Sequence, residues 1–192
     1  RHLLYGELYR DHGTAQHCLR VGTFAGKIAA AMAHEYPDGY SLLAPHDLEI
    51  AGWLHDIGKE GMLFLINNQG RLSQDERKIM AQHAHRSYDK MQRALARDVP
   101  GNDKRLNAAF QHIAVMVLKH HDGDDYPSVE EDIRLAEVHG QDISSIVRDA
   151  DNLSMMGATI LSVADRVDAI SQKNRADRPH VTKRLKEEGF ED

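Results

Sequence analysis

The adjacent pair His55-Asp56 could place an imidazole and a carboxylate on the same metal ion. The pair ends the apolar segment 48–54, which we predict to be a buried helix that stops where Gly58 permits a turn. Burial of a charged carboxylate costs on the order of several kcal/mol unless a cation or hydrogen bonds offset it. A bound metal ion would supply that compensation.

A second pair, His46-Asp47, has a different context. The chain contains 13 histidines, so a His-Asp pair arises easily by chance, and the surrounding residues must decide its meaning. This pair follows Pro45 at the expected start of the same helix, where an aspartate suits the free amides and the helix dipole. We interpret it as structural.

Further donors lie on separate predicted helices, as ligands from different parts of one bundle would: His17, His83, the doublet His120-His121, and Asp165. We expect His17 in the first turn of a helix capped near Thr14, and His83 within a helix opened by a capping box at Ser73. The doublet closes the apolar run 113–118. Several imidazole donors favour a transition metal over Mg²⁺ or Ca²⁺ alone.

The order of these motifs resembles the HD superfamily of metal-dependent phosphohydrolases, and more narrowly the HD-GYP family of cyclic di-GMP phosphodiesterases. The resemblance covers most of the chain and rests on residues 17–21, 54–61, 70–73, 79–83, 120–122, 125–127, 160–170 and 177–179. It implies an all-α fold, a helical bundle around a dinuclear metal site. We expect residues 1–192 to form a single domain of this kind, in which residues 1–13 are a connecting helix from an upstream domain. By resemblance, that neighbour would be a receiver or sensor module.

The same resemblance implies roles for individual residues. The metal ligands would be His17, His55, Asp56, His83, His120, His121 and Asp165. Asp56 would be shared by two divalent transition-metal ions, iron or manganese, and would be catalytic together with Lys59. The substrate would contact Lys59, Tyr126 and Arg178. The implied reaction is hydrolysis of a cyclic dinucleotide, above all cyclic di-GMP, by a metal-activated water.

Some positions depart from the family pattern. Gly13 stands where some members carry a glutamate for a third metal, so we expect two metals. The segment after the doublet is short, and Asp125 replaces the glycine expected before Tyr126. The added negative charge near an anionic ligand leaves two alternatives open. The chain could hydrolyse another nucleotide phosphoester, or it could be a catalytically weak module that senses cyclic dinucleotides.

The last ligand also has an alternative. The chain has more residues between Pro127 and Ile160 than the family pattern requires. Asp151 lies in this stretch, in a segment that resembles the terminal aspartate motif of other HD-superfamily enzymes. We favour Asp165 over Asp151. Asp168, one helical turn beyond Asp165, would support the ligand or orient a basic neighbour.

Composition narrows the class of partner. The 24 basic and 30 acidic residues give a net charge of −6, which argues against a surface for polymeric nucleic acid. Cys18 is the only cysteine, so intrachain disulfides are excluded and a reducing cytoplasm is expected. We find no apolar run of membrane-spanning length and therefore expect no membrane contact.

The remaining histidines lack such a context. We interpret His85 as a non-ligand on a different helix face from His83. The other histidines without partners are interpreted as surface or capping residues: His2, His12, His34, His112, His139 and His180. Residues 62–66 are expected to form a short buried run.

Overall fold

The computed structural model describes residues 12–40, 43–66, 72–98, 104–121 and 152–187 of the chain. Every regular element in these ranges is helical: α2 (His12–Glu35), α3 (Pro37–Tyr40), α4 (Pro45–Leu54), the 3-10 helix η2 (Ile57–Met62), α5 (Leu63–Ile66), α6 (Gln74–Ala81), α7 (His83–Asp98), α8 (Lys104–Lys119) and α11 (Asn152–Glu187). The predicted all-α fold is therefore confirmed for this part of the chain.

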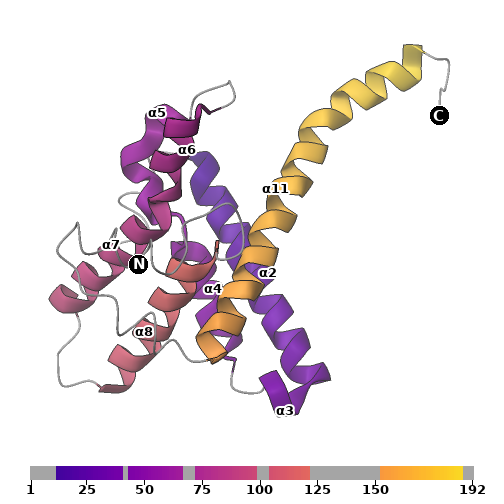
Figure 1. The fold of residues 1–192 in the computed structure, drawn as a ribbon. Helices are drawn as coiled ribbons and strands as arrows, with labels where there is room; N and C mark the ends of the chain where they lie inside the picture. Colours follow the sequence, from indigo (N-terminus) through magenta and orange to yellow (C-terminus); the bar gives the residue numbers. More distant parts are fainter. Residues whose placement is uncertain (1–11, 41–42, 67–71, 99–103, 122–151, 188–192) are drawn as a thin grey trace.

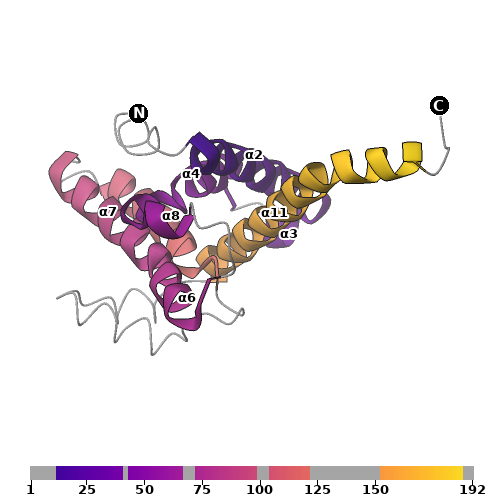
Figure 2. The same cartoon turned by 90° about the horizontal axis from the view of Figure 1, so that it is seen from above.

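The longer helices pack around a shared apolar core (Figure 1). The core residues have almost no exposed surface and come from α2, α4, α7, α8 and α11: Val21, Leu48, Ala51, Met91, Val117 and Leu161. Both views show the C-terminal half of α11 extending away from the other drawn helices, whereas its first half lies within the bundle (Figures 1 and 2). The functional donors of α11 fall on that first half.

Glycines allow a close crossing of α2 and α4. A Cβ atom on Gly52 would lie 2.3 Å from the Cα of Gly22, and a Cβ on Gly22 would lie 2.4 Å from Cδ1 of Trp53. No side chain fits between two backbones at such distances. The crossing brings the end of α4 against the N-terminal half of α2, so the donors that flank these glycines become neighbours.

A second close approach joins α8 to α11. A Cβ on Gly157 would lie 2.7 Å from Sδ of Met116, and Nδ1 of His112 lies 2.8 Å from the hydroxyl of Ser154. The interpretation of His112 as a surface or capping residue is therefore wrong, because its ring is partly buried and bonds across the helix interface. His34 is exposed, as expected.

The ends of several helices differ from the sequence-based expectation. Helix α2 already includes His12, so Thr14 does not cap it and His17 lies beyond the first turn. The capping box at Ser73 is confirmed, but its helix ends at Ala81 and His83 begins the next helix. Local capping signals located that helix start correctly, whereas its length depends on packing.

Residues 62–66 form the end of η2 and the short helix α5. Met62 and Leu65 are buried, as expected, but Phe64 is 65% exposed. None of the helices in the described residues is both long enough and apolar enough to span a membrane. Tyr126 and Asp151 lie outside the described residues, as does most of the predicted connecting segment 1–13.

Replacement of Gly52 by alanine should destabilise the fold by about 1–3 kcal/mol, because the added Cβ meets backbone atoms that cannot rotate away. Urea unfolding followed by circular dichroism measures the change. The matched control is Gly61→Ala, whose new Cβ would have Arg86 Nη1 as its nearest atom at 3.5 Å. Equal stability of the two variants would contradict the proposed role of the crossing.

Candidate metal centre

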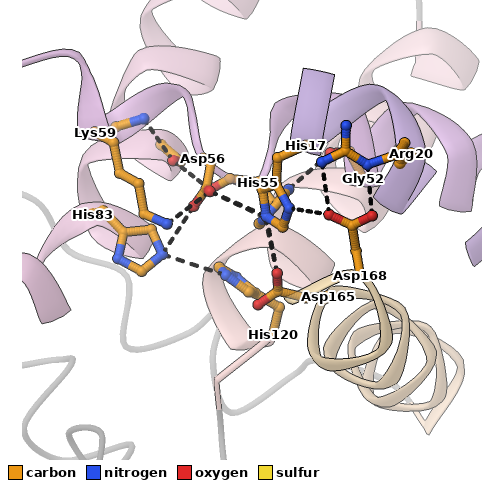
Figure 3. A network of polar contacts seen from close by, with 12 residues as sticks. His17, Arg20, Gly52, His55, Asp56, Lys59, His83, His120, Asp165 and Asp168 are labelled. Carbon is orange, nitrogen blue, oxygen red and sulfur yellow. Dashed lines mark hydrogen bonds and ion pairs between the residues drawn. The ribbon is translucent and has the colours of Figure 1, made fainter. Parts of the chain in front are cut away.

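The predicted donors converge on one region of the bundle (Figure 3). Three groups have ligand atoms within 4.8 Å of one another: His83, His120 and His121; His17, His55 and Asp56; and His55, His120 and Asp165. The donors come from α2, the turn after α4, the start of α7, the turn after α8, and α11. Of the predicted substrate contacts, Lys59 lies beside this cluster, Tyr126 is outside the described residues, and Arg178 belongs to α11 by its backbone alone.

Three imidazoles are fixed in the same way. In each ring, Nδ1 faces the backbone carbonyl oxygen of the residue three positions earlier. The distances are 2.8 Å for His55 and Gly52, 2.7 Å for His83 and Met80, and 2.6 Å for His120 and Val117. A carbonyl only accepts, so each Nδ1 carries the hydrogen and donates it. In the neutral rings, Nε2 therefore carries no hydrogen, and its lone pair points into the cluster. Metal-bound histidines are commonly held by such a hydrogen bond on the second ring nitrogen.

Asp56 lies at the centre of the cluster and is only 1% exposed. Its Oδ1 is 3.3 Å from Nε2 of His83, and its Oδ2 is 3.4 Å from Nε2 of His55 and 3.6 Å from Nε2 of His17. Among the described residues, Oδ1 of Asp56 and Nε2 of His55 are buried without a hydrogen-bond partner. Unsatisfied buried polar atoms are rare because each costs about 1–3 kcal/mol.

The ring nitrogens also face one another closely. Nε2 of His83 lies 3.4 Å from Nε2 of His120 and 3.2 Å from Nε2 of His121. The Nδ1 atoms of His83 and His120 donate to carbonyls, so the first contact brings two lone pairs together when both rings are neutral. A cation between them would convert this repulsion into coordination. The donor set, nitrogen with carboxylate oxygen, suits a divalent transition metal.

Burial and neighbouring charges set the protonation states of the histidines in the cluster. Burial, reinforced by Lys59, lowers the pKa of His83 to about 3, and burial lowers the pKa of His121 to about 4. Burial and the neighbouring His121 also hold the pKa of His120 well below its ordinary value. At neutral pH these three rings are therefore uncharged, which is the form that binds a metal.

The carboxylates of the cluster stay ionised. Burial opposes the charge of Asp56, but His55 and Lys59 outweigh it and hold the pKa of that carboxyl well below its usual range. Burial also opposes the charge of Asp165, whose pKa is lowered by its hydrogen bond with His17. Burial disfavours a proton on His55, yet the charge of Asp56 raises the pKa of that ring well above its ordinary value. Without a cation, His55 is thus the ring that compensates the buried carboxylate.

The turn that carries His55 and Asp56 is held by α7. Helix α4 ends at Leu54, as expected, but Gly58 is not what stops it, because this glycine lies inside η2. Glycine is needed because a Cβ there would lie 2.1 Å from the carbonyl oxygen of His83. The hydroxyl of Ser87 donates to the carbonyl of His55 at 2.7 Å and accepts from the amide of Gly58 at 2.8 Å.

Asp168 reaches the cluster through His17. Its Oδ2 lies 2.8 Å from Nδ1 of His17, while Nε and Nη2 of Arg20 donate to its two oxygens at 2.6 and 3.0 Å. The carboxylate thus supports a candidate ligand and also orients a basic neighbour. The sequence analysis assigned no role to Arg20 or Ser87. The feature that could have pointed to them is their position one helical turn after a candidate ligand, His17 and His83 respectively.

Part of the chain is similar to known proteins. A sequence model described as HD domain matches residues 14–156. The chain is 33% identical over 123 residues to a protein named cyclic di-GMP phosphodiesterase from Thermotoga maritima. The match covers 62% of this chain and 29% of that protein, so the chain spans less than a third of the relative's length. No solved structure gives a significant match.

Metal should stabilise the folded chain. With Mn²⁺ at about 100 times its dissociation constant, a single site adds about 2.7 kcal/mol to the free energy of unfolding. His120→Ala should lose most of this gain, because the ring is buried in two of the candidate ligand groups. Thermal unfolding with Mn²⁺ and with chelator measures the difference. His46→Ala is the matched control, since its side chain is 72% exposed; a loss as large as that of His120→Ala would contradict the assignment.

Ser87→Ala should reduce the free energy of unfolding by about 1–3 kcal/mol, because it leaves a buried amide and a buried carbonyl without a partner. Denaturant unfolding of the metal-free protein measures this effect. Ser162→Ala is the control, and it should change stability by no more than about 0.5 kcal/mol because that serine lies partly exposed on α11. An unchanged Ser87→Ala protein would show that the bridge is not needed.

Proposed function

Because this chain belongs to the HD domain family, we propose that it is a metal-dependent phosphohydrolase. One observation carries the proposal: the central carboxylate Asp56 is buried, keeps an unpartnered oxygen, and is surrounded by imidazole nitrogens held for coordination. A structural core would leave neither the oxygen of Asp56 nor Nε2 of His55 unpaired. The cluster therefore fits a resident divalent cation.

Two divalent transition-metal ions, iron or manganese, would occupy the cluster. Their proposed ligands are His17, His55, Asp56, His83, His120, His121 and Asp165. Two of the three candidate groups share no residue: His83, His120 and His121, and His17, His55 and Asp56. Asp56 lies near both, since Oδ1 faces His83 and Oδ2 faces His17 and His55, and this supports the number two. When bound, such ions supply a deprotonated water at neutral pH and neutralise charge on a phosphoryl group.

We favour Asp165 as the last ligand. Its Oδ1 lies 3.0 Å from Nε2 of His17 and 3.9 Å from Nε2 of His55. It also belongs to a group of three donors with His55 and His120. Asp151 stays an alternative by sequence alone, because it lies outside the described residues.

Lys59 would act on the substrate. Its ammonium lies 2.7 Å from Oδ2 of Asp56 and its side chain is 24% exposed. Burial opposes the charge, but Asp56 raises the pKa of Lys59, so the side chain stays cationic. A cation on Oδ2 would compete with the ammonium for this oxygen, which would leave Lys59 available to a phosphate. A fixed positive charge next to the scissile bond stabilises the charge that develops on the phosphoryl oxygens.

The proposed substrate is a cyclic dinucleotide, above all cyclic di-GMP. The support is the motif order of the sequence together with the name of the relative from Thermotoga maritima. Tyr126 and Arg178 would hold the dinucleotide. The acidic residue at 125, where the family pattern has glycine, favours a second candidate, hydrolysis of another nucleotide phosphoester.

The protein loaded with Mn²⁺ or Fe²⁺ should convert cyclic di-GMP to a linear dinucleotide or to GMP, as chromatography would show. Lys59→Ala should lower kcat about 100-fold or more with a smaller change in KM, because its charge acts mainly in the transition state. Lys78→Ala is the control, since this lysine is exposed on α6 and pairs with Asp75.

The other outcomes of this assay separate the alternatives. Turnover of a different nucleotide from a panel, with cyclic di-GMP untouched, would support the second candidate. Tight binding of cyclic di-GMP without any product would indicate a sensing module. Absence of bound metal after anaerobic purification and reconstitution would contradict all three.

A further inference from the structure

His17 is held differently from the other fixed imidazoles of the cluster. His55, His83 and His120 each donate Nδ1–H to a neutral backbone carbonyl of their own segment. His17 instead contacts a carboxylate, Asp168, which lies 151 positions away on another helix. The two supports differ in charge, and only the second depends on how α2 packs against α11.

The carboxylate is itself tightly fixed. Asp168 is 1% exposed, and Arg20 contacts both of its oxygens through a planar pair of donors (Figure 3). Without Arg20, the buried carboxylate of Asp168 would lose its charged partner and keep the ring of His17 and, at 3.5 Å, the side-chain amide of Gln172. Arg20 is one turn from His17 on α2, so the ligand and the residue that holds its support move together.

We propose that Asp168, clamped by Arg20, is a positioning residue that sets the tautomer and orientation of His17 and thereby controls metal occupancy at the position formed by His17, His55 and Asp56. When Nε2 binds a metal, the hydrogen of the neutral His17 ring is on Nδ1, and Asp168 accepts it there because an ionised carboxylate only accepts. It also places a negative charge next to the ring, whereas a carbonyl supplies only a dipole. The position formed by His83, His120 and His121 has no such contact with Asp168.

This inference rests on the proposed function only in assuming that the cluster binds metal. Mn²⁺ alone is therefore the probe, added to the chelator-treated full chain in a calorimetric titration without substrate. The wild type should bind in two steps. Asp168→Asn should weaken one step about 10–100-fold and leave the other unchanged, because an amide can either donate or accept and no longer fixes the tautomer of His17.

Several variants separate positioning from a merely structural ion pair. Asp168→Glu should recover part of the affinity, and Arg20→Gln should cause a smaller loss because Asp168 can still reach His17. Val167→Ala, the neighbouring residue on α11 with 43% exposure, should bind metal as the wild type does.

The possible results are distinct. Absence of metal binding by the wild type would overturn the proposed function. Normal wild-type binding with both steps unchanged in Asp168→Asn, or with both weakened equally, would overturn this inference alone. If Asp168→Asn does not fold, Arg20→Gln decides: selective loss of one step supports the inference, and unchanged binding contradicts it.

Discussion

The structure depends on the charge of Asp56, a carboxylate placed where almost no water reaches it. In that environment a negative charge needs a partner within a few ångströms. Lys59 satisfies one oxygen and His55 supplies partial compensation, but the second oxygen is left without a hydrogen bond. Nε2 of the neutral His83 ring faces this oxygen at 3.3 Å. Such an arrangement is unstable as a protein core and stable as a cation site.

The donors can meet only because backbones approach unusually closely. Gly22 against Gly52 joins α2 to α4, and Gly58 against His83 joins the turn to α7. Each glycine lies within about two turns of a candidate ligand, so the crossings that close the core also set the ligand spacing. Folding and formation of the cluster are therefore one event, as expected where ligands come from separate helices.

The cluster contains two kinds of support for its imidazoles. Carbonyl support is local, because the carbonyl three residues earlier exists in any helical turn and requires no particular side chain. The support of His17 by Asp168 is tertiary and charged. The first kind is insensitive to sequence change, whereas the second gives the fold a means to treat the candidate group that contains His17 differently from the others.

The sequence alone determined the kinds of donor, their order along the chain, and the helical nature of the segments that carry them. Adjacent residues and 3.6-residue periods are local properties, so the capping box at Ser73 and the apolar run before His120 could be predicted. Tertiary packing decided where some helices end and which side chains meet. The end of α6 before His83, the contact of His112 with Ser154, and the role of Gly58 as a spacer for α7 all depend on atoms distant in sequence. A local pattern carries no information about which helix will lie against it, so the partners of Asp56 and Asp168 became known only from the fold.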